Sequence, residues 1–232
     1  MQAKEVKEKL KFLISEASLI DPNLAKRLDE IRRWIKDTKD GSLNTKKLVM
    51  AFLLEAIEDS EVWLQLKVQT PEVCQLDLAR MTAPVRYWYS YLFPKWLNEA
   101  DSKLYIWKQK MMAGEFNQED VELLAKIVNE IKSRQGTVLQ RYVADLSMAT
   151  DLIVSSSQEK PLCVQLTSLS EEFTEIKYQD WKNTLREWGI ERGLFLSFHP
   201  GEPEFIKQLV NITLYNSNNL KIGSYLKFSV PS

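Results

Sequence analysis

The chain has 232 residues, enough for one large domain or two small ones, and its 44% hydrophobic and 27% charged residues are typical of a folded globular protein. A net charge of −1 excludes a polycation that would bind nucleic acid through its overall charge. The single histidine, His199, excludes a His-rich metal site and argues against a Ser-His-Asp or Cys-His catalytic group.

The two cysteines and the lack of long apolar runs indicate the cellular setting. Cys74 and Cys163 both lie among apolar neighbours, which predicts buried free thiols rather than a disulfide framework. The first residues are charged and contain no apolar signal segment. No apolar run approaches the roughly 18–20 residues that a membrane-spanning helix needs. We therefore expect a soluble, cytoplasmic protein.

Helical apolar spacing dominates the N-terminal half. Asp21 and Pro22 break the first helix and start the second, residues 40–42 form a turn, and Pro94 predicts an interruption of an aromatic-rich helix. The segment between Pro71 and Pro84 has no firm assignment. The expected helices span about residues 4–20, 22–39, 44–66 and 85–112.

A further long helix is expected after Gly114. Asn117 is a suitable N-cap and acidic residues follow it in the first turn. Apolar residues at helical spacing extend this helix to about Met148, with a weak point at Gly136.

The pattern changes at Asp151. Two short apolar runs, 151–154 and 161–166, flank a polar connection and predict a hairpin. Ser170 and the acids after it start a helix that ends at Gly189. The remaining expected elements are a strand over 193–198, a short helix over about 203–211, and strands over 211–215 and 224–230.

These elements predict an α+β protein with two domains. Residues 1–116 form a helical domain, and residues 117–232 form a small α/β domain that includes its leading helix. A strand–strand–helix–strand order, with the last strand returning beside the hairpin, requires a mixed sheet and a crossover helix.

The C-terminal order resembles the core of the PD-(D/E)XK nuclease-like superfamily, the restriction-endonuclease-like fold, over about residues 130–200. In that family a helix leads into a hairpin, and a second helix and a further strand follow. The family's metal-binding Asp begins one hairpin strand, as Asp151 does here. Its Glu or Gln lies on the next strand, as Gln165 does, and is followed one residue on by Lys, where this chain has Thr167.

The resemblance implies a metal-dependent phosphodiesterase site. Asp151 and Gln165, through its carbonyl, would bind Mg²⁺, and Glu130 on the preceding helix would supply a second carboxylate. Because Thr167 carries no charge, the resemblance implies a relocated cation on the following helix, where Lys177 and Lys182 lie and Lys177 is the preferred choice. A second departure from the family is that no strand is expected before Asp151.

Each of these residues also has a structural interpretation. An Asp at a strand start after a helix is commonly a turn or capping residue. Gln165 on a half-buried strand can be a hydrogen-bonded surface residue, and Thr167 is a good strand former. The absence of a strand Lys favours a weakened or inactive site over an active one.

Residues 80–96 interleave three cations with six aromatic side chains. This pattern suits a single-stranded nucleic-acid surface or a protein interface. A buried helical core segment is the favoured interpretation, because helices with this aromatic density usually bury it. His199 follows a strand end and is expected to be a turn residue.

The function predicted from the sequence is therefore a nuclease-like protein that acts on or near nucleic acid, DNA or RNA, with Mg²⁺ as cofactor if the site is active. Asp151, Gln165 and Lys177 are its candidate catalytic residues. The alternative is a non-catalytic interaction or scaffold protein with the same fold, whose partner would bind residues 80–96.

Overall fold

The chain forms two compact units in the computed structural model, which describes residues 1–115, 118–168, 171–198 and 204–229. The first unit comprises residues 1–80 and 93–116, and the second comprises residues 81–92 and 117–232. The helical domain expected over 1–116 therefore lacks residues 81–92. Asn117, Ser170 and His199, for which the sequence predicted two helix starts and a turn, lie outside the described residues.

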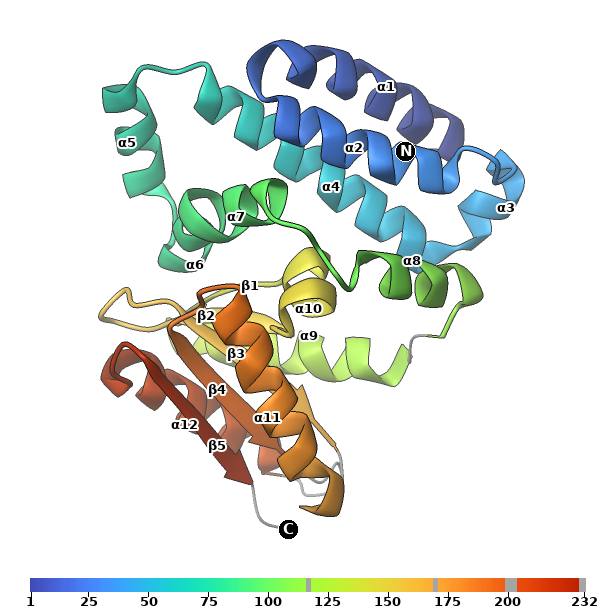
Figure 1. Cartoon of the computed structure of the whole chain (residues 1–232). Coiled ribbons are helices and arrows are strands. Elements are labelled where there is room, and N and C mark those ends of the chain that lie inside the picture. The colour runs from blue at the N-terminus through green and yellow to red at the C-terminus, as the bar shows by residue number, and fades with distance from the viewer. Residues whose placement is uncertain (116–117, 169–170, 199–203, 230–232) are drawn as a thin grey trace. The chain divides into compact units, whose positions relative to one another are not determined.

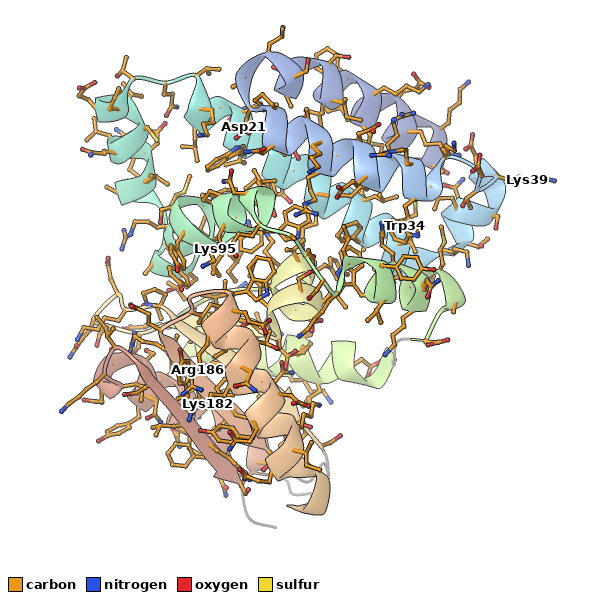
Figure 2. The ribbon with its side chains drawn as sticks, viewed as in Figure 1. Asp21, Trp34, Lys39, Lys95, Lys182 and Arg186 are labelled. Carbon is orange, nitrogen blue, oxygen red and sulfur yellow. The ribbon has the colours of Figure 1, made fainter. Side chains whose placement is uncertain are left out.

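The first unit is helical, and its ribbons can be followed in Figure 1. Asp21 caps its second helix by accepting hydrogen bonds from the backbone N–H groups of Asn23 and Leu24. Trp34, labelled in Figure 2, packs edge-on against Phe52 and Trp107 in the core. The helices are α1 (Ala3–Ile20), α2 (Pro22–Ile35), α3 (Asp40–Thr45), α4 (Lys47–Lys67), α5 (Pro71–Arg80), α7 (Phe93–Asn98) and α8 (Leu104–Ala113).

Two expectations for this region are wrong. The second helix ends at Ile35 rather than near 39, and residues 40–42 belong to the short helix α3 rather than to a turn. The Lys7 ammonium of α1 donates to the carbonyl of Thr38 and to the carboxylate of Asp40, between these two helices and at the start of α3. Of the helices within the described residues, none combines the length and apolar character needed to cross a membrane.

The chain does not break at Pro94. Helix α6 (Ala83–Tyr87), the π-helix η1 (Trp88–Leu92) and α7 follow one another directly. A proline inside an α-helix lacks the N–H donor and clashes with the carbonyl four residues earlier. The wider π-turn just before Pro94 relieves this clash, so a π-helix stands where an interruption was predicted.

The second unit is built on a five-stranded mixed sheet in the order β1-β2-β3-β4-β5. The first three strands pair antiparallel, and β3, β4 and β5 pair parallel through crossover helices. The predicted hairpin and mixed sheet are confirmed, and the fold class is α+β. The strands are β1 (Thr137–Leu139), β2 (Leu152–Ser155), β3 (Leu162–Thr167), β4 (Arg192–Ser197) and β5 (Ser224–Ser229); the helices are α9 (Gln118–Ser133), α10 (Tyr142–Met148), α11 (Glu171–Glu187) and α12 (Phe205–Asn219).

The single helix predicted over 117–148 is wrong. Helix α9 ends at Ser133, because Gln135 adopts a left-handed conformation at φ 62° and the Gly136 N–H returns to the Ile131 carbonyl at 3.0 Å. A Cβ atom at position 136 would stand 2.8 Å from both Ile131 Cγ2 and Leu214 Cδ2, so these side chains would have to move to admit it. The chain then forms β1 and α10, and a strand therefore precedes Asp151 after all.

The strand predicted over 211–215 is also wrong, because these residues lie inside α12. Leu209, Val210, Thr213, Asn216 and Ser217 are buried at helical spacing, which outweighs the strand preference of the β-branched residues in this segment.

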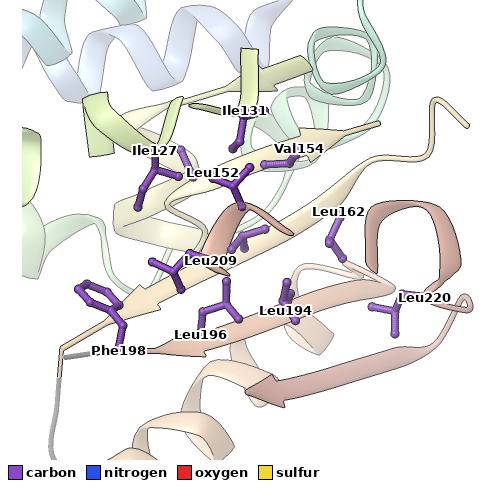
Figure 3. Close-up of a cluster of buried hydrophobic side chains, with 12 residues drawn as sticks. Ile127, Ile131, Leu152, Val154, Leu162, Leu194, Leu196, Phe198, Leu209 and Leu220 are labelled. Carbon is purple, nitrogen blue, oxygen red and sulfur yellow. The ribbon is translucent and has the colours of Figure 1, made fainter. Parts of the chain in front are cut away.

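The sheet is covered on both faces. On one face, alternate residues of β2, β3 and β4 form an apolar core with α9 and α12, shown in Figure 3. On the other face, Tyr178 and Trp181 of α11 pack against Phe195 of β4. Because side chains alternate along a strand, Asp151, Gln165 and Thr167 belong to the α11 face. The members of the apolar core are Ile127, Ile131, Leu152, Val154, Leu162, Val164, Leu194, Leu196, Phe198, Leu209, Val210 and Leu220.

Candidate functional site

The turn that leads to Asp151 is fixed from both sides. Helix α10 closes with Ala149 in a left-handed conformation, φ 51° and ψ 50°, and the Thr150 N–H returns to the Ala144 carbonyl at 2.9 Å. The Trp181 indole N–H of α11 donates to the Ala149 carbonyl at 3.1 Å, and the Trp188 indole donates to the Ser147 carbonyl at 2.9 Å. These two indoles hold the turn in place under α11.

Asp151 and Gln165 meet above the sheet, as the sequence predicted. Leu152 is paired with Val164 in the antiparallel ladder, so one step further along this register sets Asp151 opposite Gln165. The Gln165 Nε2 atom donates to Asp151 Oδ2 at 2.7 Å, and the Leu166 backbone N–H donates to the same oxygen at 2.6 Å. The half-buried carboxyl group thus ties the start of β2 to the end of β3.

A second carboxyl group, that of Asp145 on α10, contacts Asp151. Burial is the largest cause that raises the pKa of Asp151 well above its ordinary value, and the negative charge of Asp145 and a hydrogen bond between the two side chains add to it. The Leu166 N–H and the charge of Lys177 act in the opposite direction. Asp145 was not among the predicted site residues, because the sequence pattern placed it inside one long helix with no defined direction relative to Asp151.

Lys177 of α11 reaches the strand residue Thr167. Its ammonium nitrogen lies 3.1 Å from the Thr167 hydroxyl oxygen, and the same charge acts on Asp151. Lys177 precedes Trp181 by one helical turn, so both side chains lie on the face of α11 directed toward the sheet. Among the described contacts, Lys177 rather than Lys182 bonds to a strand residue.

Glu130 is not brought to this group. Its carboxylate accepts from the Arg134 guanidinium, which also contacts Asn211 of α12. Helix α9 covers the opposite face of the sheet, so the structure separates Glu130 from Asp151 by the sheet itself. Asp145 on α10 stands near Asp151 instead.

The donor set around Asp151 consists of hard oxygen atoms. In the part of the chain that the structure describes, no three His, Cys, Asp or Glu side chains gather to hold a metal ion. The carboxyl groups of Asp145 and Asp151 nevertheless fit Mg²⁺, which proteins commonly hold through one or two carboxylates with water and substrate phosphates. The Gln165 amide directs its Nε2 atom toward Asp151, so it must rotate to offer its carbonyl oxygen to the same ion. The two half-buried carboxyl groups share a hydrogen bond that needs a proton, and a bound cation would take the place of that proton.

The aromatic segment 80–96 is largely buried. Trp88, Tyr89, Phe93 and Trp96 are each less than 5% exposed, which matches the core interpretation favoured by the sequence. Tyr91 is 37% exposed, and its hydroxyl donates to the Gly189 carbonyl at 2.9 Å. Few of its rings are therefore accessible for stacking on bases or for a protein partner.

Comparison with known proteins found no match among protein-family models, curated proteins or solved structures. The candidate site therefore rests on the geometry of this chain alone.

Proposed function

We propose that the chain is a nuclease-like protein that acts on nucleic acid through a metal-dependent phosphodiesterase site on the α11 face of its sheet. The observation that carries this proposal is the meeting of Asp151 and Gln165 on neighbouring strands, with the Lys177 ammonium beside Thr167. Strand β1, which precedes Asp151, and the parallel β3–β4 crossover support the proposed likeness to the PD-(D/E)XK core.

The residues of the site have separate tasks in this proposal. Asp145, Asp151 and the Gln165 carbonyl would hold Mg²⁺, which when bound polarises a phosphate oxygen and lowers the pKa of a bound water. The Lys177 ammonium balances the negative charge of the phosphate group. The Leu166 N–H keeps the Asp151 carboxyl group in place on the sheet.

The test is metal-dependent cleavage. The purified protein is incubated with single- and double-stranded DNA and RNA in the presence of Mg²⁺, Mn²⁺ or a chelator. We expect cleavage that the chelator abolishes. We also expect Asp151→Asn to reduce cleavage to background, because the uncharged amide can still accept the Leu166 N–H but supplies no negative charge to bind the metal ion. Asp180→Asn on the exposed side of α11 is the matched control and keeps full activity. Absence of metal-dependent cleavage for all four substrates contradicts the proposal.

A non-catalytic scaffold is the second candidate, and a specific observation favours it. Asp151 Oδ2 already accepts two hydrogen bonds, one of them from the backbone of β3, which is how a structural carboxyl group joins two strands. This candidate predicts no cleavage and an Asp151→Asn protein that resembles the wild type in every binding assay. Salt-sensitive binding of nucleic acid without cleavage would support nucleic acid as the partner and would contradict the enzymatic role.

A further inference from the structure

We propose that Thr167 is a positioning residue: its hydroxyl group fixes the Lys177 ammonium over the end of β3 as a binding point for a phosphate oxyanion. The inference deepens the proposed function. It rests on that function in one respect, namely that the phosphate belongs to a nucleic-acid backbone.

Thr167 offers a rigid hydrogen-bond acceptor. It is 5% exposed, it is paired with Ser197 in the parallel ladder, and its carbonyl accepts from the Phe198 N–H at 3.0 Å. Its side chain is β-branched and therefore has few rotamers. The position of its hydroxyl oxygen is thus set by the sheet rather than by solvent.

Lys177 needs such an acceptor. Its side chain is exposed and has a flexible four-carbon stem, so an unheld ammonium would sample many positions. The 3.1 Å hydrogen bond to Thr167 selects the positions in which the charge lies over the end of β3. Gln165, which bonds to Asp151, lies two residues before Thr167 on the same face of β3, so the ammonium and the Asp151 carboxyl group share this face of the sheet.

The charge of Lys177 is available to a ligand. Lys207 and Lys227 in the same unit form ion pairs with Glu204 and Glu175, whereas within the described residues no carboxylate pairs with Lys177. One of its three N–H groups serves Thr167, which leaves two donors. A compact cation with free donors binds phosphate oxygens as a point charge.

The experiment observes the ammonium directly. In ¹⁵N-lysine-labelled protein, Lys177→Gln assigns the Lys177 Nζ resonance, and inorganic phosphate is titrated against chloride at constant ionic strength. We expect a slowly exchanging resonance that shifts with phosphate in the wild type and in Thr167→Ser. In Thr167→Val the resonance exchanges rapidly and its phosphate response falls by at least about fivefold, since loss of a hydrogen bond to a charged group is of this size or larger.

Two results overturn the inference: a Thr167→Val protein that responds like the wild type, or a wild-type Lys177 resonance that exchanges as fast as those of solvent-exposed lysines. Should Thr167→Val fail to fold by circular dichroism, Thr167→Ala supplies the same comparison. The outcome is separable from that of the cleavage assay. A phosphate response that depends on Thr167, without any cleavage, supports the inference and contradicts the proposed nuclease activity. Cleavage that depends on Asp151 but is unchanged in Thr167→Val supports the nuclease activity and contradicts the inference.

Discussion

Gly193 of β4 lies directly beneath the Trp181 indole of α11: a Cβ atom at position 193 would stand 2.8 Å from Trp181 Cη2 and would also overlap Leu185. Trp181 holds the Ala149 carbonyl in the turn before Asp151. The lack of a side chain at position 193 therefore allows α11 to approach the sheet closely. This approach in turn sets the position of Lys177 above Thr167.

The first prediction is that Gly193→Ala destabilises the second unit by about 1–3 kcal/mol, the usual effect of overpacking a well-packed core. The indole and Leu185 must move outward to admit the methyl group. Urea unfolding followed by circular dichroism measures the loss. Gly41→Ala is the control, because a Cβ atom added there would meet no atom within 4 Å and α3 is helical at this position. Equal stability of Gly193→Ala and the wild type would show that α11 does not rest on this glycine.

Arg192 leads to the second prediction. Its buried guanidinium donates to the carbonyls of Leu220, Pro161, Asn216 and Ser217, at distances between 2.6 and 3.2 Å. It thereby binds carbonyls at the end of α12 to the starts of β3 and β4. Burial lowers the pKa of Arg192, but an arginine stays charged at neutral pH.

We expect Arg192→Met to lose about 3 kcal/mol or more, since several buried carbonyls are left without donors. Arg192→Lys should recover only part of this, because an ammonium cannot span the four acceptors that the planar guanidinium reaches. Chemical denaturation compares the two variants. A methionine variant as stable as the wild type would mean that water replaces the guanidinium at these carbonyls.

The strands near the candidate site could be predicted because their sequence signals are local. The apolar runs on both sides of residues 156–160 define the hairpin, and strand alternation places Gln165 and Thr167 on one face. With the register of the ladder, Asp151 follows opposite Gln165. The contact of Lys177 with the sheet was also predictable, because the sequence shows a helix after β3 with Lys177 and Lys182 on it, about one helical turn apart.

The remaining elements depend on contacts that are distant in sequence. The sequence shows Gly136 as a weak point within a helix, whereas the left-handed Gln135 before it and the contact with Leu214 of α12 are visible only in the structure. The apolar residues of α12 carry a strand preference that the core under the sheet overrides. Glu130 was expected near Asp151, but Asp145 lies there instead. The sequence pattern did not show that α9 ends and α10 begins between these two acids, so it could not show which face of the sheet each acid reaches.

The third prediction concerns Ala149, which adopts φ 51° at the end of α10. A left-handed conformation costs a non-glycine residue roughly 1–2 kcal/mol. Ala149→Gly removes this strain while the glycine adds entropy to the unfolded chain, so we expect a change between zero and about 1 kcal/mol of stabilisation. Ala144→Gly, within α10, is the matched control and is expected to destabilise by about 1 kcal/mol or more. Thermal unfolding distinguishes the two, and equal losses would contradict a strained turn.

The last prediction uses the pH dependence of stability. Burial, and then Asp145, raise the pKa of Asp151 above its ordinary value of 3.8 in the folded protein. The folded state therefore binds this proton more tightly than the unfolded chain. The resulting stabilisation is complete below about pH 4 and is lost as the pH rises toward the folded pKa, with a slope of at most about 1.4 kcal/mol per pH unit.

Asp151→Asn should abolish this loss. The asparagine carbonyl still accepts from Leu166 and Gln165, but the side chain has no proton to release. We expect the variant to match the wild type near pH 4 and to exceed its stability at pH 7. We expect Asp145→Asn to reduce the total loss of stability between pH 4 and pH 8, because without the neighbouring charge the pKa of Asp151 is raised less. Urea midpoints measured between pH 4 and pH 8 give both slopes. If Asp151→Asn instead loses stability at pH 7 and keeps the pH dependence of the wild type, the carboxyl group is ionised and stabilising in the folded protein. The Asp145–Asp151 pair is then not the source of the pH dependence.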